Sequence, residues 1–180
     1  FDGSGLVLLT PEDAEHEIKF SPDGRFFVDN FSRVDLAPQS VLRRSSDGKI
    51  VQELEQADIH RLLAAGWQPP ERFKAKARDG ETDIYGVIFR PSNFDSTQKY
   101  PVVEATYTGP HTFRTPPSFQ RGYRNQDQPI AELGFIVITV DGFGSAKRSK
   151  VFHNFSYQNL GDIGAEDHMA AMRQLAKKYK

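Results

Sequence analysis

One tyrosine stands where a side chain is well placed for chemistry. Tyr107 closes a β-rich run that begins at Val102, and the strong turn signal Gly109-Pro110 follows it. A phenol at the end of a strand, beside a turn, is held by a rigid element and stays accessible. Two interpretations remain open: an aromatic side chain packed beneath a loop, or a hydroxyl that donates a hydrogen bond to a developing oxyanion.

A second candidate loop follows an almost continuous apolar run. Residues 134–142 favour a strand covered on both faces, and Asp141-Gly-Phe-Gly144 lies at its end. Gly142-Phe-Gly144 is a weak match to a dinucleotide-binding turn, because Lys147 replaces the third glycine and no helix opens immediately. We therefore predict no cofactor.

The parts of a complete catalytic triad are not recognisable in the sequence. Gly-x-Ser-x-Gly, which would place a serine nucleophile between a strand and a helix, does not occur, and neither does a Walker-type phosphate loop. The five histidines lack recognisable partner residues; they are His16, His60, His111, His153 and His168. The acidic residues around His16 (residues 12–17) offer ligands to a metal, but no ligand spacing repeats elsewhere. We predict a solvated loop there and no metal site.

Composition narrows the class of protein. The chain has 180 residues, enough for one domain or parts of two, and its 38% hydrophobic and 26% charged content is ordinary for a globular protein. A net charge of −1 gives no electrostatic reason to expect nucleic-acid binding. No apolar run reaches the ~18 residues of a membrane span. Cysteine is absent, which excludes disulfides, thiolate catalysis and cysteine-ligated zinc.

The first 55 residues alternate short β-prone runs with tight-turn signals. Ser21-Pro-Asp-Gly24 and Ser45-Ser-Asp-Gly48 suit tight turns. The predicted strands cover 17–20, 25–30, 40–44 and 49–54. Together they suit one antiparallel sheet of the kind that forms a β-propeller blade, which needs neighbours to bury its faces. Residues 56–70 read as a linker with a short helix at 58–66, on which we expect His60 to be exposed.

The remaining residues, 71–180, predict an open α/β sheet. A hairpin is expected at 71–77 and 82–90, a strand at 102–106, an irregular stretch at 111–128, a short helix at 129–133 and the strand at 134–142. A closing helix is expected at 164–179. Its apolar face is predicted from helical spacing, with both methionines as core residues: Ala165, Met169, Met172, Ala176 and Tyr179.

Several ordered motifs extend over almost the whole chain. They are Phe20-Ser-Pro-Asp-Gly24, Ser32-Arg-Val-Asp35, Leu42-Arg-Arg-Ser-Ser-Asp-Gly48, Gly86-Val-Ile-Phe-Arg-Pro91, Lys99-Tyr-Pro101, Tyr107-Thr-Gly-Pro110, Leu133-Gly-Phe-Ile-Val137, Asp141-Gly-Phe-Gly144 and Asn159-Leu-Gly-Asp162. With these motifs the sequence resembles the prolyl oligopeptidase family of serine peptidases, in its dipeptidyl peptidase IV branch. The resemblance implies that residues 1–55 are the last antiparallel strands of a β-propeller and that 71–180 are the first half of an α/β-hydrolase domain.

The resemblance also implies a function. Tyr107 matches the family's tyrosine that supplies an oxyanion-hole hydroxyl, and the nucleophile, acid and base of the triad are expected beyond Lys180. We expect a fragment of a secreted or periplasmic serine peptidase that acts on peptides, releasing amino-terminal dipeptides, with a post-proline preference typical of the branch. The sequence departs from the branch at Phe143, where an arginine is common, so no substrate contact is assigned to that loop.

The fragment itself leads to further expectations. The chain begins at Phe1 and stops at Lys180 directly after a helical pattern, so both ends look cut. Alone, it should be inactive and should self-associate or form a homo-oligomer, because a half sheet leaves an unpaired edge and an uncovered apolar face. The alternative is a non-catalytic binding or assembly module, since some relatives have lost the nucleophile. Gly-x-Ser-x-Gly in the sequence after Lys180 would favour the peptidase.

Overall fold

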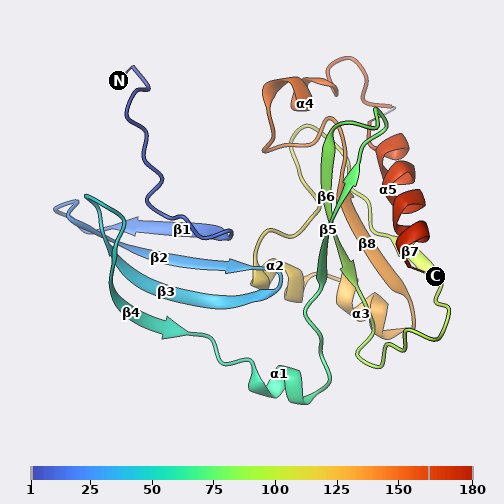
Figure 1. Ribbon diagram of the computed structural model, residues 1–180, viewed down its shortest axis with the longest axis horizontal. Coiled ribbons are helices and arrows are strands. Elements are labelled where there is room, and N and C mark those ends of the chain that lie inside the picture. The colour runs from blue at the N-terminus through green and yellow to red at the C-terminus, as the bar shows by residue number, and fades with distance from the viewer. Residues whose placement is uncertain (1, 162, 180) are drawn as a thin grey trace.

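The computed structural model describes residues 2–161 and 163–179, so Asp162 of the last motif lies outside the described residues. The described chain contains two four-stranded sheets (Figure 1). Sheet A contains β1 (Glu15–Phe20), β2 (Phe26–Arg33), β3 (Leu36–Arg44) and β4 (Ile50–Gln56). Sheet B contains β5 (Glu71–Lys76), β6 (Asp83–Phe89), β7 (Val102–Glu104) and β8 (Ile136–Asp141).

Sheet A is the antiparallel meander that the sequence predicts. Its strands pair in chain order, β1-β2-β3-β4, and the first tight turn closes through a hydrogen bond from the Gly24 amide to the Ser21 carbonyl (2.9 Å). Side chains at alternate positions of β2 are buried on one face, including Phe27, Asp29 and Phe31. This period of two is what a sheet covered on a single face requires.

Much of sheet A remains uncovered. Its outer strands, β1 and β4, have no fully buried residue, and large apolar side chains on them are exposed. These exposed residues are Ile18, Phe20, Ile50, Val51 and Leu54. Sheet A therefore leaves apolar side chains and the edges of its outer strands exposed.

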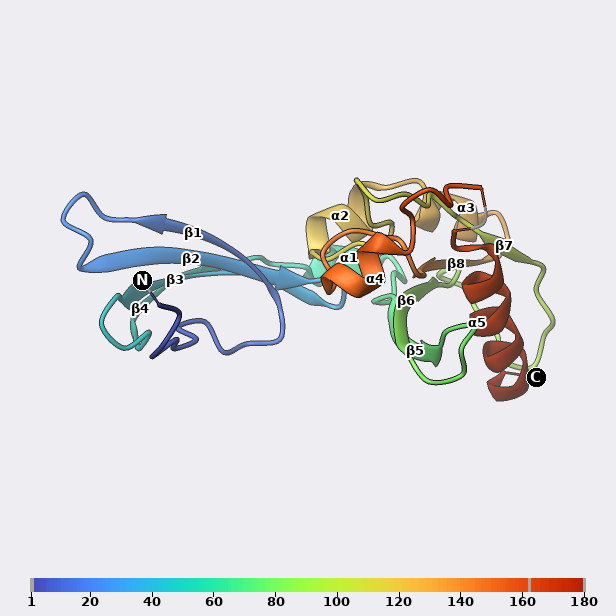
Figure 2. The ribbon, with the colours of Figure 1, turned by 90° about the horizontal axis from the view of Figure 1, so that it is seen from above.

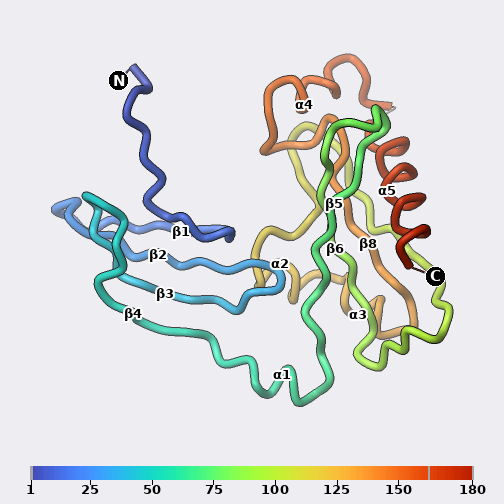
Figure 3. Tube along the Cα trace, in the orientation of Figure 1, coloured from blue at the N-terminus to red at the C-terminus, as the bar shows by residue number. Residues whose placement is uncertain are grey.

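A short connection joins the two sheets (Figure 3). Helix α1 (His60–Ala64) is shorter than the predicted 58–66, and the Asp58 carboxylate accepts a hydrogen bond from the His60 amide (2.9 Å). The His60 side chain is exposed, as predicted. Trp67 follows the helix, is buried, and packs edge-on against Phe119 with ring centroids 5.5 Å apart.

Sheet B is mixed, with strand order β5-β6-β8-β7. The hairpin β5–β6 and the pair β6–β8 are antiparallel, whereas β7 runs parallel to β8. The sheet with its helices gives the α/β class that the sequence predicts. Strand β7 ends at Glu104, two residues earlier than predicted, although the Ala105 amide still donates to the Ile138 carbonyl (2.9 Å).

Helices cover both faces of sheet B (Figure 2). One core contains Ile84 and Ile88 of β6 and packs against α5 (Ala165–Lys178). The other contains Val87 and Phe89 and packs against Ala131 of α3 (Asp127–Glu132). Side chains at alternating positions of β6 thus pack into the cores on opposite faces, as expected for a strand in a sheet that is covered on both faces.

Two short helices were not predicted. Helix α2 (Phe119–Arg124) lies inside the stretch predicted to be irregular, and α4 (Lys150–Asn154) lies in the loop after β8. Each begins after a serine cap: Ser118 precedes α2, and Ser149 accepts a hydrogen bond from the Phe152 amide (3.3 Å). Helices this short are stabilised by tertiary contacts, which a sequence pattern does not reveal.

The predicted buried face of α5 is confirmed only in part: Met172 and Tyr179 pack against the core, whereas Ala165 and Ala176 are exposed. Met169 is 49% exposed, and the residues buried on this helix are Asp167, His168, Ala171 and Leu175. The prediction assumed that polar residues point outward. Asp167 and His168 are buried because tertiary partners compensate their polar atoms, as described below. Among the described residues, no helix is long and apolar enough to cross a bilayer.

Candidate active site around Tyr107

Tyr107 lies just beyond the carboxyl end of β7. Its side chain is 57% exposed, and its ring meets that of His111 edge-on, with centroids 6.0 Å apart. The phenol is therefore anchored through a strand of a well-packed sheet while its ring remains accessible to solvent. Carboxyl ends of parallel strands are the usual place for ligands in open α/β sheets.

A hollow borders Tyr107 on the side of the following loop. It is lined by Thr106, Tyr107, Thr112, Phe113, Arg114, Pro116, Arg121 and Asn125. Both arginines already have partners: Arg114 pairs with the buried Asp127, and Arg121 stacks over the Phe113 ring at 5.2 Å. The hollow is thus bordered by positive charge that is held in place by neighbouring side chains.

The two loops singled out in the sequence lie next to each other. The Asp141 carboxylate at the end of β8 accepts hydrogen bonds from the backbone amides of Arg114 (2.5 Å) and Thr115 (2.9 Å). The Ala146 amide donates to the Thr112 carbonyl (2.8 Å). Asp141 therefore fixes the segment that follows Tyr107-Thr-Gly-Pro110, a role that the sequence pattern did not indicate.

The Asp141–Gly144 loop is also held by the buried carboxylate of Asp167. Asp167 of α5 accepts hydrogen bonds from the Phe143 amide (2.8 Å) and from the Arg78 amide and Nε (2.9 and 3.0 Å). A Cβ at Gly142 would collide with the Asp167 side chain, so the loop needs glycine there. In the sequence, Asp167 is only one of two acidic residues near the start of the predicted helix, so this contact was not predicted.

The side chain of Phe143 is part of the core. Its ring lies 4.8 Å from Phe152 and 5.2 Å from Phe155, measured between centroids. The residue at which the sequence departs from the family pattern therefore serves packing in this structure.

Four of the five histidines have polar partners that the sequence did not reveal. His16 faces Asp29, His60 faces Asp58, His153 Nε2 lies 2.8 Å from the Pro110 carbonyl, and His168 Nδ1 lies 2.5 Å from Glu104. Most of these pairs join residues far apart in the chain, which explains why no spacing signalled them. Within residues 2–161 and 163–179, no serine hydroxyl forms a hydrogen bond with a histidine ring.

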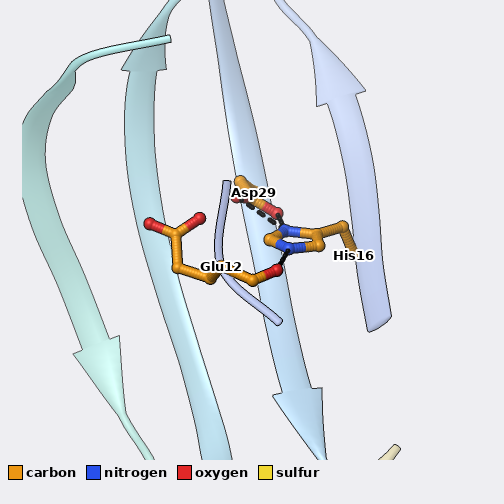
Figure 4. Close-up of side chains that lie close together, drawn as sticks. All are labelled: Glu12, His16 and Asp29. Atoms are coloured by element: carbon orange, nitrogen blue, oxygen red, sulfur yellow. Dashed lines mark hydrogen bonds and ion pairs between the residues drawn. The ribbon is translucent and has the colours of Figure 1, made fainter. Parts of the chain in front are cut away.

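The acidic stretch before β1 is more ordered than predicted. Glu12 and His16 meet the buried Asp29 of β2, and their candidate ligand atoms lie within 4.8 Å of one another (Figure 4). His16 Nδ1 is 2.9 Å from Asp29, and its Nε2 is 3.1 Å from the Glu12 carbonyl. The prediction of a solvated loop is thus wrong for these residues.

A buried arginine, Arg43, pairs with both carboxylates of this cluster. The Arg43 guanidinium pairs with Asp29 (2.8 Å) and with Glu12 (2.7 Å). Burial opposes ionisation of Glu12, but the hydrogen bond and charge of Arg43 outweigh it and hold the pKa of Glu12 below its ordinary value. Because a cation already compensates both carboxylates, we interpret the cluster as an ion-pair network that ties residues 12–16 to sheet A.

Comparison with known proteins points to one family. Residues 121–179 match the family model described as "Prolyl oligopeptidase family". The chain is 28% identical over 181 residues, 98% of its length, to "Probable dipeptidyl-aminopeptidase B" of Trichophyton verrucosum. It is also 28% identical over 113 residues, 63% of its length, to "Dipeptidyl peptidase 8" of Homo sapiens. The predicted resemblance to the prolyl oligopeptidase family is confirmed.

Solved structures agree with this assignment. A structure from Bacteroides ovatus, provisionally named dipeptidyl aminopeptidase IV, is 29% identical and superposes with a TM-score of 0.79 over 92% of this chain and 23% of that one. Dipeptidyl peptidase 4 of Porphyromonas gingivalis shares the fold, with a TM-score of 0.72 at 23% identity, over 91% of this chain and 23% of its own. The chain spans about a fifth of the length of its fungal relatives.

Proposed function

We propose that this chain is part of a serine peptidase that removes dipeptides from the amino ends of peptides, and that Tyr107 supplies a hydroxyl to its oxyanion hole. The observation that carries the proposal is an exposed phenol at the carboxyl end of β7, in a chain that aligns over nearly its whole length with dipeptidyl-aminopeptidases. In the branch it resembles, cleavage after proline is the expected preference, and a secreted or periplasmic location is expected.

Tyr107 would act in the acyl-transfer step. A serine outside these 180 residues attacks the scissile carbonyl, and negative charge develops on the carbonyl oxygen. The Tyr107 hydroxyl donates a hydrogen bond to that oxygen, and the bond is stronger in the tetrahedral state than in the ground state. One such donor is worth about 3 kcal/mol of transition-state stabilisation.

The two sheets would belong to two parts of the longer protein. Residues 1–55 are proposed as the last strands of a β-propeller, 56–70 as a linker, and 71–180 as the first half of an α/β-hydrolase domain. The wholly antiparallel order of sheet A and its exposed apolar residues support the first assignment. The mixed sheet B, with helices on both faces, supports the last.

The experiment compares the 180-residue chain with the longer protein that would contain it. Both are assayed with a dipeptidyl p-nitroanilide and labelled with a fluorophosphonate that reacts with activated serines. We expect turnover and labelling of the longer protein and neither from the isolated chain, because the triad supplies the attacking group. A longer protein that is folded but inactive and unlabelled, without Gly-x-Ser-x-Gly after residue 180, would contradict the peptidase and favour the non-catalytic module.

A further inference from the structure

The segment that carries Tyr107 needs an anchor other than the sheet. Regular pairing of β7 ends at Glu104, and the last backbone bond to β8 comes from the Ala105 amide. Among the described residues, the backbone of residues 106–108 forms no hydrogen bond with another backbone group, so side-chain contacts help to set its direction. Three residues on this segment contact α5 or the residue that caps it: Glu104, Thr106 and Thr108.

His168 is the main polar contact between α5 and this segment. Its side chain is 4% exposed, and its Nδ1 lies 2.5 Å from Glu104 Oε1 and 3.0 Å from Thr106 Oγ1. One ring nitrogen thus contacts both Thr106, through a hydrogen bond, and Glu104, at ion-pair distance. Its Nε2 is buried and has no hydrogen-bond partner among the described residues, and neither has Glu104 Oε1, so the hydrogen bond of the ring is the one between Nδ1 and Thr106, with Glu104 at ion-pair distance from the same nitrogen.

The start of α5 also contacts Thr108, the residue that follows Tyr107. Gly164 caps the helix with φ of 89°, and a Cβ at this position would overlap Thr108. The helix therefore contacts the chain immediately before and immediately after Tyr107. The residues that contact the start of α5, Thr106 and Thr108, flank Tyr107 directly on both sides.

We propose that His168 is a positioning residue that holds the Tyr107 hydroxyl in the direction needed for oxyanion stabilisation. This inference rests on the proposed function of Tyr107. His168 does not touch the substrate; it fixes Glu104 and Thr106, and through them the backbone that presents the phenol. Catalysis by a preorganised donor is sensitive to small displacements, so loosening this segment should slow the chemical step more than it weakens substrate binding.

The test uses His168 variants of the longer, active protein. We expect His168→Ala to lower kcat about tenfold with KM changed less than about twofold. His168→Asn should restore most of the rate, because its amide nitrogen occupies about the position of Nδ1. His168→Gln places its amide nearer the position of Nε2 and should not restore it. His60→Ala, at an exposed histidine, is the matched control and should match the wild type.

A double-mutant cycle with Tyr107→Phe separates positioning from general damage. If His168 acts through Tyr107, the double variant His168→Ala/Tyr107→Phe should be no slower than Tyr107→Phe alone. Losses that multiply, or a wild-type rate for His168→Ala, would overturn the inference. If His168→Ala fails to fold, equal rates for the Asn and Gln variants would overturn it. A wild-type rate for Tyr107→Phe would instead refute the oxyanion role on which it rests.

Discussion

Sheets A and B have four strands each, but side chains are buried on both faces of sheet B and mainly on one face of sheet A. In sheet B, the neighbouring β6 residues Ile88 and Phe89 pack into hydrophobic cores on opposite faces of the sheet, and helices cover both faces. In sheet A, β4 has no buried residue, and burial is concentrated on one face of β2. The covered sheet supplies a rigid frame for a loop such as that of Tyr107, whereas the uncovered sheet is suited to contact further structure.

A buried ion pair accompanies each of the two sheets. Sheet A buries Arg43 and Asp29 against each other. Next to sheet B, Asp167 of α5 is buried beneath the loop after β8, and Arg78 pairs with it at 3.0 Å. In both, a buried charge is tolerated because an opposite charge and hydrogen bonds compensate it. The Asp167 network lies under the Asp141–Gly144 loop, and Asp141 holds the segment that follows Tyr107, so disrupting this network should affect both stability and activity.

The largest effect should come from truncating the core of sheet B. Phe89→Ala removes a fully buried ring and should lower the free energy of unfolding by about 3–5 kcal/mol. Phe20→Ala in sheet A is the matched control: its ring is 59% exposed, and we expect a loss of about 1 kcal/mol or less. Urea denaturation of both variants measures the difference. Equal losses would contradict the contrast between the two sheets.

Breaking the buried pair under the loop should come next. Asp167→Asn leaves the shape of the side chain but removes the charge that compensates Arg78, and should cost about 3 kcal/mol of unfolding free energy. Glu166→Gln alters a neighbouring, mostly exposed partner of the same arginine and should cost about 0–1 kcal/mol. Thermal denaturation distinguishes them. A small effect of Asp167→Asn would show that the loop is held by packing alone.

Acid should weaken the contacts of Glu71 in sheet B. Burial opposes ionisation of Glu71, but hydrogen bonds from Tyr179, Arg90 and Lys178 outweigh it and hold the pKa of Glu71 below its ordinary value of 4.5. The resulting stability is present above the unfolded pKa and is lost as the pH falls through the lower, folded pKa. Denaturation curves between pH 7 and pH 3 should therefore show a shallower loss of stability in Glu71→Gln than in the wild type. Parallel losses would contradict this.

The mildest effect concerns association of the isolated chain. We propose that it self-associates through the exposed apolar side chains of sheet A, and that Phe20→Ser/Ile50→Ser reduces the association. Static light scattering over a concentration series measures it. The control is Leu133→Ser, at an exposed apolar residue next to α3 of sheet B, which should leave association unchanged. A dilute, monodisperse wild-type monomer would contradict the proposal.

Local patterns predicted most of the fold. The four strands of sheet A, the hairpin β5–β6 and the apolar strand β8 follow from alternation, continuous apolar runs and turn residues. Helices α2 and α4 were missed because five or six residues carry too little periodicity to stand out. The buried face of α5 was predicted only in part: Met172 and Tyr179 pack against the core, but the burial of Asp167 and His168 was missed, because buried polar residues cannot be distinguished from exposed ones until their partners are known.

The candidate site was predicted only at its centre. The position of Tyr107 follows from a strand followed by a turn, which are local features. Its supports are not local: His168 is 62 residues from Thr106, and Asp167 is 89 residues from Arg78. No spacing rule connects residues so far apart, so these contacts emerge only when the helix and the strands are placed together in space.

The proposed role of Tyr107 is tested most directly by single-turnover kinetics of Tyr107→Phe in the longer protein. The substitution removes one hydroxyl from an exposed ring and should leave the fold intact. We predict that acylation by a dipeptidyl p-nitroanilide slows by about 100-fold or more while KM stays within about twofold. An acylation rate equal to that of the wild type would contradict the oxyanion role.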